Sequence, residues 1–291
     1  MAEAILLLLL TGAIWAFVGV LFGAAPSETD RLWSFFSSTG LLFAAFVWTA
    51  QAPAAAPAGE VLRLSAAIVP SACMEVAAFF FLKRAMDRGS QGIAWSVSQS
   101  SMVVSFLCSV AFLRSAAAPA QWAGLALVLA GLALFGRNKP AAAPGANDAR
   151  YVRLVLAAFV LVGIGQFLRL LPGSMHLSKE ALTWRLPLQA PVGAVFWTGL
   201  CLAKGVWRPR AVWKASIPYA VVSVLGQTCF YLATDAADAR RLTSVVMPVS
   251  IGTCILLFAL WCRFFRGERL SRGGWTAVAL DIAGIALLSC A

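Results

Sequence analysis

The chain contains an internal repeat, with one copy near the end of each half. Residues 121–134, QWAGLALVLAGLAL, and residues 274–287, GWTAVALDIAGIAL, are identical at seven of fourteen aligned positions. Each segment closes a series of apolar runs, which indicates a duplication. We count five apolar spans in each copy. Because five is odd, the second copy must cross a membrane in the orientation opposite to the first, as in proteins built from inverted repeats.

The composition is that of a membrane protein. Hydrophobic residues make up 61% of the chain and charged residues only 12%, whereas about 25% of the residues of soluble domains are charged. The long apolar runs lack the alternation of a β-barrel, and backbone groups in hydrocarbon must be satisfied internally. We therefore predict an all-α polytopic membrane protein with ten transmembrane helices, arranged as two inverted five-helix repeats.

At about 20 residues for each span, we place the helices in two groups of five. The spans are expected at residues 4–24, 32–50, 65–85, 91–113, 119–136, 152–171, 183–203, 212–234, 241–263 and 274–290. The first repeat covers residues 1–137 and the second covers residues 151–291. A linker rich in Pro and Ala joins them at residues 138–150.

The charges and cysteines exclude several classes of protein. The net charge of +11 is interpreted as basic loops facing anionic lipid headgroups, so membrane lipids are expected partners and nucleic acid is not. The chain has seven Cys, no CxxC pair and a single His, His176, so we expect no metal site and no cofactor. It has no GxxxxGK[ST] motif, so transport powered by ATP is not predicted.

The basic residues predict the orientation in the membrane. In the ten-span arrangement, seven of the 23 Lys and Arg residues lie on the side of the termini and sixteen on the opposite side. Because cytoplasmic loops carry the excess of Lys and Arg, we expect both termini to lie outside, in a multi-pass protein of the inner or plasma membrane. A monomer or a homodimer is expected.

Two acids lie deep inside predicted spans. A charged side chain at the bilayer centre costs about 2.5 to 3.5 kcal/mol on insertion scales, so such residues need a reason. Glu75 lies near the middle of the third span and is the first candidate for proton coupling; a hydrogen-bonded structural Glu is the alternative. Asp281 in the tenth span is the second candidate. Its small neighbours, among them Ala277 and Gly284, favour a structural hydrogen bond across a close helix contact.

Polar side chains follow one face of several spans and predict the walls of a wet cavity. In the span 212–234 they recur at every fourth residue, which keeps them on one winding stripe. The candidates for substrate binding are Trp95, Gln99, Gln166, Arg185, Gln189, Tyr219, Ser223, Gln227 and Tyr231. Interhelical hydrogen bonding is the alternative for each of them. For Arg185 and its neighbour Arg169, the alternative to anion binding is snorkelling to the headgroups, which we favour.

The C-terminal segment resembles the drug/metabolite transporter superfamily, in its EamA-like branch. In that family a Pro in the ninth helix is followed by a Gly-Glu pair, a short loop and a tenth helix that contains Gly. The matching residues here are Pro248, Gly267, Glu268 and Gly284. The first half repeats the pattern imperfectly. The resemblance implies a ten-helix, two-repeat permease for small organic solutes, without naming a substrate.

These observations favour a secondary transporter over an enzyme. The expected activity is gradient-driven or facilitated movement of a small polar organic metabolite by alternating access, with proton coupling through an intramembrane acid. One alternative is a flippase for a lipid or a lipid-linked substrate on the same scaffold. Another is a membrane-embedded enzyme acting on a lipid carrier, which needs paired acids or clustered His at one membrane face; the loop acids of this chain are too dispersed for that.

Overall fold

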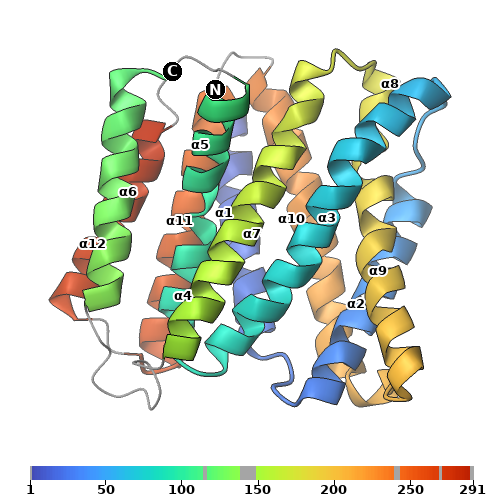
Figure 1. Ribbon diagram of the computed structural model, residues 1–291, viewed down its shortest axis with the longest axis horizontal. Coiled ribbons are helices and arrows are strands. Elements are labelled where there is room, and N and C mark those ends of the chain that lie inside the picture. The colour runs from blue at the N-terminus through green and yellow to red at the C-terminus, as the bar shows by residue number, and fades with distance from the viewer. Residues whose placement is uncertain (1, 114–116, 138–148, 239–242, 269–270, 289–291) are drawn as a thin grey trace.

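The computed structural model describes residues 2–113, 117–137, 149–238, 243–268 and 271–288, and these form a bundle of helices without a strand (Figure 1). The first half of the chain, residues 2–137, contains α1 (Ala2–Gly23), α2 (Thr29–Ala50), α3 (Ala58–Met86), α4 (Gln91–Gln99), α5 (Met102–Phe112) and α6 (Pro119–Arg137). The second half contains α7 (Ala149–Ser174), α8 (Lys179–Leu182), α9 (Arg185–Lys204), the 3₁₀ turn η1 (Pro209–Ala211), α10 (Trp213–Asp238), α11 (Thr243–Phe265) and α12 (Arg272–Leu288). Most of the predicted linker, residues 138–148, lies outside the described residues.

The helices have the length and surface of membrane spans. Within the described residues, seven helical segments are long and apolar enough to cross a bilayer, and two shorter apolar helices, Pro119–Leu134 and Val249–Phe265, accompany them. Large apolar side chains face outward along the bundle; Phe112, Val195 and Phe265 are each more than 70% exposed. In water such a surface would be costly, but hydrocarbon is an equally apolar solvent. The outer face therefore suits a lipid environment.

The predicted span 91–113 is broken in the structure. It forms α4 and α5, with a tight turn at Ser100 and Ser101 between them. The Ser100 hydroxyl donates to the Ser96 carbonyl at 2.9 Å and to Asp281 Oδ2 at 3.0 Å. A serine that bonds back to the carbonyl four residues earlier bends a helix. The segment Gln91–Phe112 is long and apolar enough to cross a membrane, as predicted, but its helix is interrupted at the centre.

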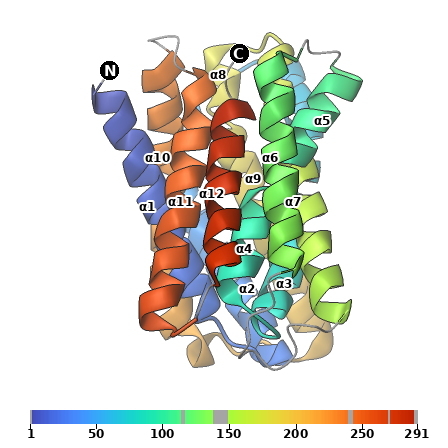
Figure 2. The same cartoon turned by 90° about the vertical axis from the view of Figure 1, so that its left-hand side faces the viewer.

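The start of α1 and the end of α12 lie at the same end of the bundle, at the top of Figures 1 and 2. We call this the termini end. The opposite end, where α6 finishes and α7 begins, is the linker end. Successive long helices run up and down between these ends, so α1 runs toward the linker end whereas α7, the first helix of the second half, runs away from it (Figure 1).

Many of the helix contacts have a counterpart when the two halves of the chain are exchanged. Helices in corresponding positions pack on each other, α2 on α9 and α6 on α12. Other contacts occur in matched pairs. Helix α3 packs on α7 as α10 packs on α1, and α11 packs on α1 as α4 and α5 pack on α7. Several contacts between the described helices therefore occur in matched pairs across the two halves of the chain.

Glycines allow the backbones of α6 and α12 to touch. A β-carbon added at Gly124 would lie 2.6 Å from the Gly284 carbonyl oxygen, and one added at Gly284 would lie 2.7 Å from the Gly124 carbonyl oxygen. Seven residues further along α6, a β-carbon added at Gly131 would lie 3.0 Å from the Ala277 carbonyl oxygen. Small residues permit such close helix approach in membranes. This pair of helices stands at one side of the bundle (Figure 1).

Candidate functional site

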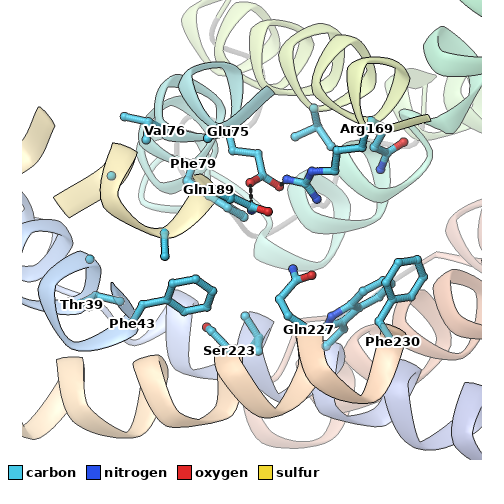
Figure 3. Close-up of a pocket in the computed structure, with 18 of the residues that line it drawn as sticks. Thr39, Phe43, Glu75, Val76, Phe79, Arg169, Gln189, Ser223, Gln227 and Phe230 are labelled. Atoms are coloured by element: carbon cyan, nitrogen blue, oxygen red, sulfur yellow. Dashed lines mark hydrogen bonds and ion pairs between the residues drawn. The ribbon is translucent and has the colours of Figure 1, made fainter. Parts of the chain in front are cut away.

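A cavity of about 440 Å³ lies where the two halves of the chain meet. Its walls come from α1 to α4 of the first half and from α7, α9, α10 and α11 of the second. Figure 3 shows side chains from these helices converging on it. Pockets for small organic ligands typically measure about 300 to 1,000 Å³, so the volume suits a small organic molecule.

The cavity brings together the side chains that the sequence proposed for substrate binding. All nine line it: Trp95 and Gln99 on α4, Gln166 on α7, Arg185 and Gln189 on α9, and Tyr219, Ser223, Gln227 and Tyr231 on α10. Gln227 points from α10 across the cavity toward α3 and α9 (Figure 3). Ser98 of the α4 stripe also lines the cavity. Met102 and Ser105, which continued that stripe in the sequence, lie beyond the break, in α5.

Glu75 of α3 lies in the cavity wall and has partners on two other helices. Its carboxylate forms an ion pair with the Arg169 guanidinium of α7 and accepts a hydrogen bond of 2.7 Å from Gln189 Nε2 of α9 (Figure 3). Arg169 Nε donates to Ser71 Oγ at 3.2 Å, and Ser71 Oγ donates to the Gly165 carbonyl at 2.8 Å. Both charged side chains are largely enclosed, Arg169 at 24% and Glu75 at 19% exposure.

The position of Arg169 corrects the snorkelling interpretation. The side chain turns inward because an opposite charge, Glu75, is available on the helix packed against α7. Pairing within a low-dielectric cavity competes well with the headgroup region, which lies further away. Glu75 is thus one half of an ion pair, a partner that the sequence did not identify.

Three further polar groups in the wall have no hydrogen-bond partner in the part of the chain that the structure describes. Arg185 Nε, Gln166 Oε1 and Thr39 Oγ1 are buried atoms without a hydrogen bond to another protein atom. Buried polar groups are nearly always paired. The cavity therefore presents a cationic donor, an amide acceptor and a hydroxyl that are free to contact a bound solute.

Aromatic rings form much of the remaining wall, and the sequence analysis missed most of them. They are Trp15, Phe36, Phe43, Phe79, Trp197 and Phe230, in addition to the predicted Trp95. The available signal was that Trp15 and Trp197 lie in the interior of spans, far from the interfacial belts where Trp is usually found. Such rings offer flat apolar faces to the body of a ligand.

An aromatic cluster closes the cavity toward the linker end. Phe22, which is 0% exposed, contacts the rings of Phe36, Phe79, Trp95 and Tyr219 at centroid distances of 5.6 to 6.4 Å. At the other side, the lining reaches Arg185, the first residue of α9 at the termini end. The cavity thus lies between the aromatic cluster and the termini end of the bundle.

Asp281 lies outside the cavity. It is 0% exposed, accepts the hydrogen bond from Ser100, and packs against Gly131 of α6. Its place at the junction of α4, α5, α6 and α12 matches the structural role that its small neighbours favoured. Among the described residues, no group of three or more His, Cys, Asp or Glu side chains is arranged to hold a metal ion.

The linker end is fastened by a contact between the two halves. Glu268, in the loop after α11, accepts hydrogen bonds from Ser90 Oγ at 2.6 Å and from the backbone N–H groups of Gln91 and Gly92 at 3.0 and 3.2 Å. It therefore caps the N-terminus of α4, where an anion is stabilised by the helix dipole. Nearby, the fully buried Lys83 pairs with Asp87 at 2.6 Å.

The fold and the site define a multi-pass helical membrane protein with a central cavity that residues from both halves of the chain line. Residues 2–137 match the EamA-like transporter family. This match relates the first half of the chain to the drug/metabolite transporter superfamily, whose EamA-type members are membrane transporters rather than enzymes.

Comparison with solved structures supports the fold. One crystal structure, whose description names no activity, covers 99% of this chain and 96% of its own at 17% sequence identity, with a TM-score of 0.57. At that identity the likeness shows the fold alone. No curated protein matches the sequence.

Proposed function

We propose that this chain is a ten-span secondary transporter built from two inverted five-helix repeats, residues 1–137 and 151–291, joined by the linker 138–150. The internal repeat, the opposite directions of α1 and α7, and the matched packing pairs support this arrangement. In this scheme α4 and α5 together form one discontinuous span. Inverted repeats place the substrate site at their interface, near the middle of the membrane, and often use broken helices there.

The observation that carries the function is the polar, aromatic cavity at the interface of the halves. It combines an ion pair, a further Arg, four Gln side chains and several aromatic rings in one enclosed space. A small polar organic metabolite would satisfy the free polar groups and pack on the rings. A lipid acyl chain would leave these groups buried and unpaired, which costs about 1 to 3 kcal/mol for each group. The cavity therefore favours a polar solute over the flippase alternative.

The enclosed linker end suggests how access alternates. The aromatic cluster around Phe22 and the Glu268 cap close that end, whereas the lining continues to Arg185 at the termini end. We propose that solute enters from the termini end, and that the halves then rock to open the linker end. The excess of Lys and Arg that the sequence assigns to the linker side would place this end in the cytoplasm, in the inner or plasma membrane. One copy of the chain supplies the whole cavity, so a monomer suffices.

Transport is tested by solute counterflow in proteoliposomes, with sugars, amino acids, nucleosides, amines and organic acids as substrates. Two glycines of α9 give a matched pair of variants. Gly193 lines the cavity and has only Val76 Cγ2, at 3.6 Å, near its added β-carbon, whereas Gly199 has nothing within 4 Å and is exposed on the outer face.

Gly193→Leu should fill the cavity and abolish counterflow of the active solute without lowering the melting midpoint, because the new side chain enters open space. Gly199→Leu should transport at the wild-type rate. Equal counterflow by both variants would show that solute does not pass through this cavity.

A further inference from the structure

The charges in the cavity do not balance. The ionisable groups that face Glu75 are Arg169 on α7, Arg185 on α9, and Tyr219 and Tyr231 on α10. Among the described residues, those of α1, α2, α4 and α11 that line the cavity include no ionisable side chain. With Glu75 ionised, the cavity carries two positive charges and one negative charge. An uncompensated charge in an enclosed site is costly unless a ligand pairs with it.

We infer that the cavity takes an organic monocarboxylate with an aromatic or other flat apolar body, and that it takes up one proton with each molecule of this anion. The inference rests on the proposed function and gives it a substrate class and a coupling step. The anion's carboxylate contacts Arg185 and Arg169, its body lies among the aromatic rings, and the proton goes to Glu75.

The partners of each group select an anion over other solutes. Arg185 Nε has no protein partner, and a carboxylate is the acceptor that a guanidinium binds best. A cation that bound Glu75 would strip Arg169 of its partner and leave two unpaired Arg side chains nearby. A phosphate monoester carries about 1.5 to 2 negative charges at pH 7, which is more than the single proton taken up with the solute can offset. A monocarboxylate supplies one charge.

Competition for Arg169 explains why a proton follows. When the carboxylate of the solute takes the guanidinium, Glu75 loses its ion pair and keeps only the hydrogen bond from Gln189. A buried carboxylate without its countercharge is strongly disfavoured, and proton binding neutralises it. No bond within the solute forms or breaks. The anion gains the guanidinium and the Glu75 carboxylate gains the proton, so the charge of the cavity is the same before and after loading.

The aromatic wall provides a binding signal, since Trp15, Trp95 and Trp197 line the cavity. Purified protein in nanodiscs is titrated with 3-phenylpropionate, its neutral amide, 3-phenylpropylamine and phenyl phosphate, and tryptophan fluorescence is recorded between pH 6 and 8. We expect 3-phenylpropionate to bind best. Its Kd should fall by up to about tenfold for each unit that the pH is lowered, because one proton binds with each anion.

Variants separate the roles of the charges. Glu75→Gln should bind 3-phenylpropionate with a Kd that does not change with pH, whereas Arg169→Gln and Arg185→Gln should each weaken binding at least about tenfold, the loss of one charge-assisted hydrogen bond. Glu60→Gln and Arg63→Gln alter the same helix, α3, outside the cavity and should bind as the wild type does. Melting midpoints identify any variant that fails to fold, and Arg185→Gln then still tests the anion site.

In proteoliposomes, an acidic exterior should drive accumulation of radiolabelled 3-phenylpropionate above the level in protein-free vesicles, which corrects for diffusion of the neutral acid. Glu75→Gln should retain exchange but lose accumulation. A Kd independent of pH in the wild type, or binding of the amide or the amine as tight as that of the carboxylate, would overturn the inference. If such a neutral or cationic solute is still exchanged and Gly193→Leu still blocks it, the proposed transporter function stands without the anion.

Discussion

The cap that Glu268 places on α4 is expected to hold the linker end closed. Replacing Glu268 with Ala removes the acceptor of three hydrogen bonds, at 2.6, 3.0 and 3.2 Å. Loss of an N-cap costs about 0.5 to 2 kcal/mol, and loss of a negative charge at a helix N-terminus costs a further 0.3 to 1 kcal/mol or so. Because Glu268 is partly exposed, water compensates for some of the loss. We therefore expect a change of about 2 kcal/mol in favour of opening.

Cys262 reports this opening. Its side chain is 1% exposed, and its sulfur lies 3.6 Å from a β-carbon placed on Gly92, in the first turn of α4. A change of 2 kcal/mol raises the open population about 30-fold. The rate at which a small water-soluble maleimide labels Cys262, measured by mass spectrometry of the Cys262 peptide, should rise by the same factor. Glu268→Gln keeps one acceptor oxygen and should give a smaller increase.

The control is Glu28→Ala, which removes an acid at the same end of the bundle. Glu28 pairs with Arg31, and both side chains are about 60% exposed, so the substitution should leave the labelling rate of Cys262 unchanged. An unchanged rate in Glu268→Ala, or an equal increase in Glu28→Ala, would refute the role of the cap.

Three further outcomes are expected. Gln227→Ala should weaken solute binding about fivefold through the loss of one hydrogen bond and leave the melting midpoint near the wild-type value; a collapse of folding in this variant would make Gln227 a structural tether. Gly284→Val should destabilise the α6–α12 contact by about 1 to 3 kcal/mol, which would lower the melting midpoint. An unchanged melting midpoint would contradict the close packing described. Asp87→Ala should destabilise the protein more than Lys83→Met does, by about 3 kcal/mol, because it leaves a buried ammonium group unpaired; equal melting midpoints would argue against a charged Lys83.

Orientation is tested by a fluorescent reporter fused to the C-terminus and by cysteine labelling of the loop around Arg266. We expect the loop to be reached from the cytoplasm and the reporter to be dark, because it would be exported unfolded. A bright reporter would reverse the orientation proposed here.

The span positions could be predicted because the length of an apolar run is a property of the chain alone. Helices α2 and α9 begin and end within a few residues of the predicted spans 32–50 and 183–203. The polar stripe of α10 was also predictable, since side chains four residues apart share a face of any helix. The four stripe residues accordingly line one cavity.

The partners of the charged residues could not be predicted in the same way. Whether Arg169 reaches a headgroup or Glu75 depends on how α7 packs against α3, and no periodicity within either segment contains that information. The break at Ser100 has the same origin. Serine is common in helices, so its presence alone does not predict a break. The helix is interrupted at Ser100, where Asp281 from the other half accepts a hydrogen bond from the serine hydroxyl.

The contact between α6 and α12 explains why the repeat is most visible there. The touching pairs are Gly124 with Gly284 and Gly131 with Ala277, and in the alignment of the two copies Gly124 corresponds to Ala277 and Gly131 to Gly284. A larger side chain at any of these glycines would therefore collide with the backbone of the facing helix. Each of the two segments thus restricts the size of the residues that the other can carry at the contact. The cavity imposes no such mutual limit. There, Glu75 and Ser223 both stand five residues after a proline, Pro70 and Pro218, and the two positions carry chemically different side chains.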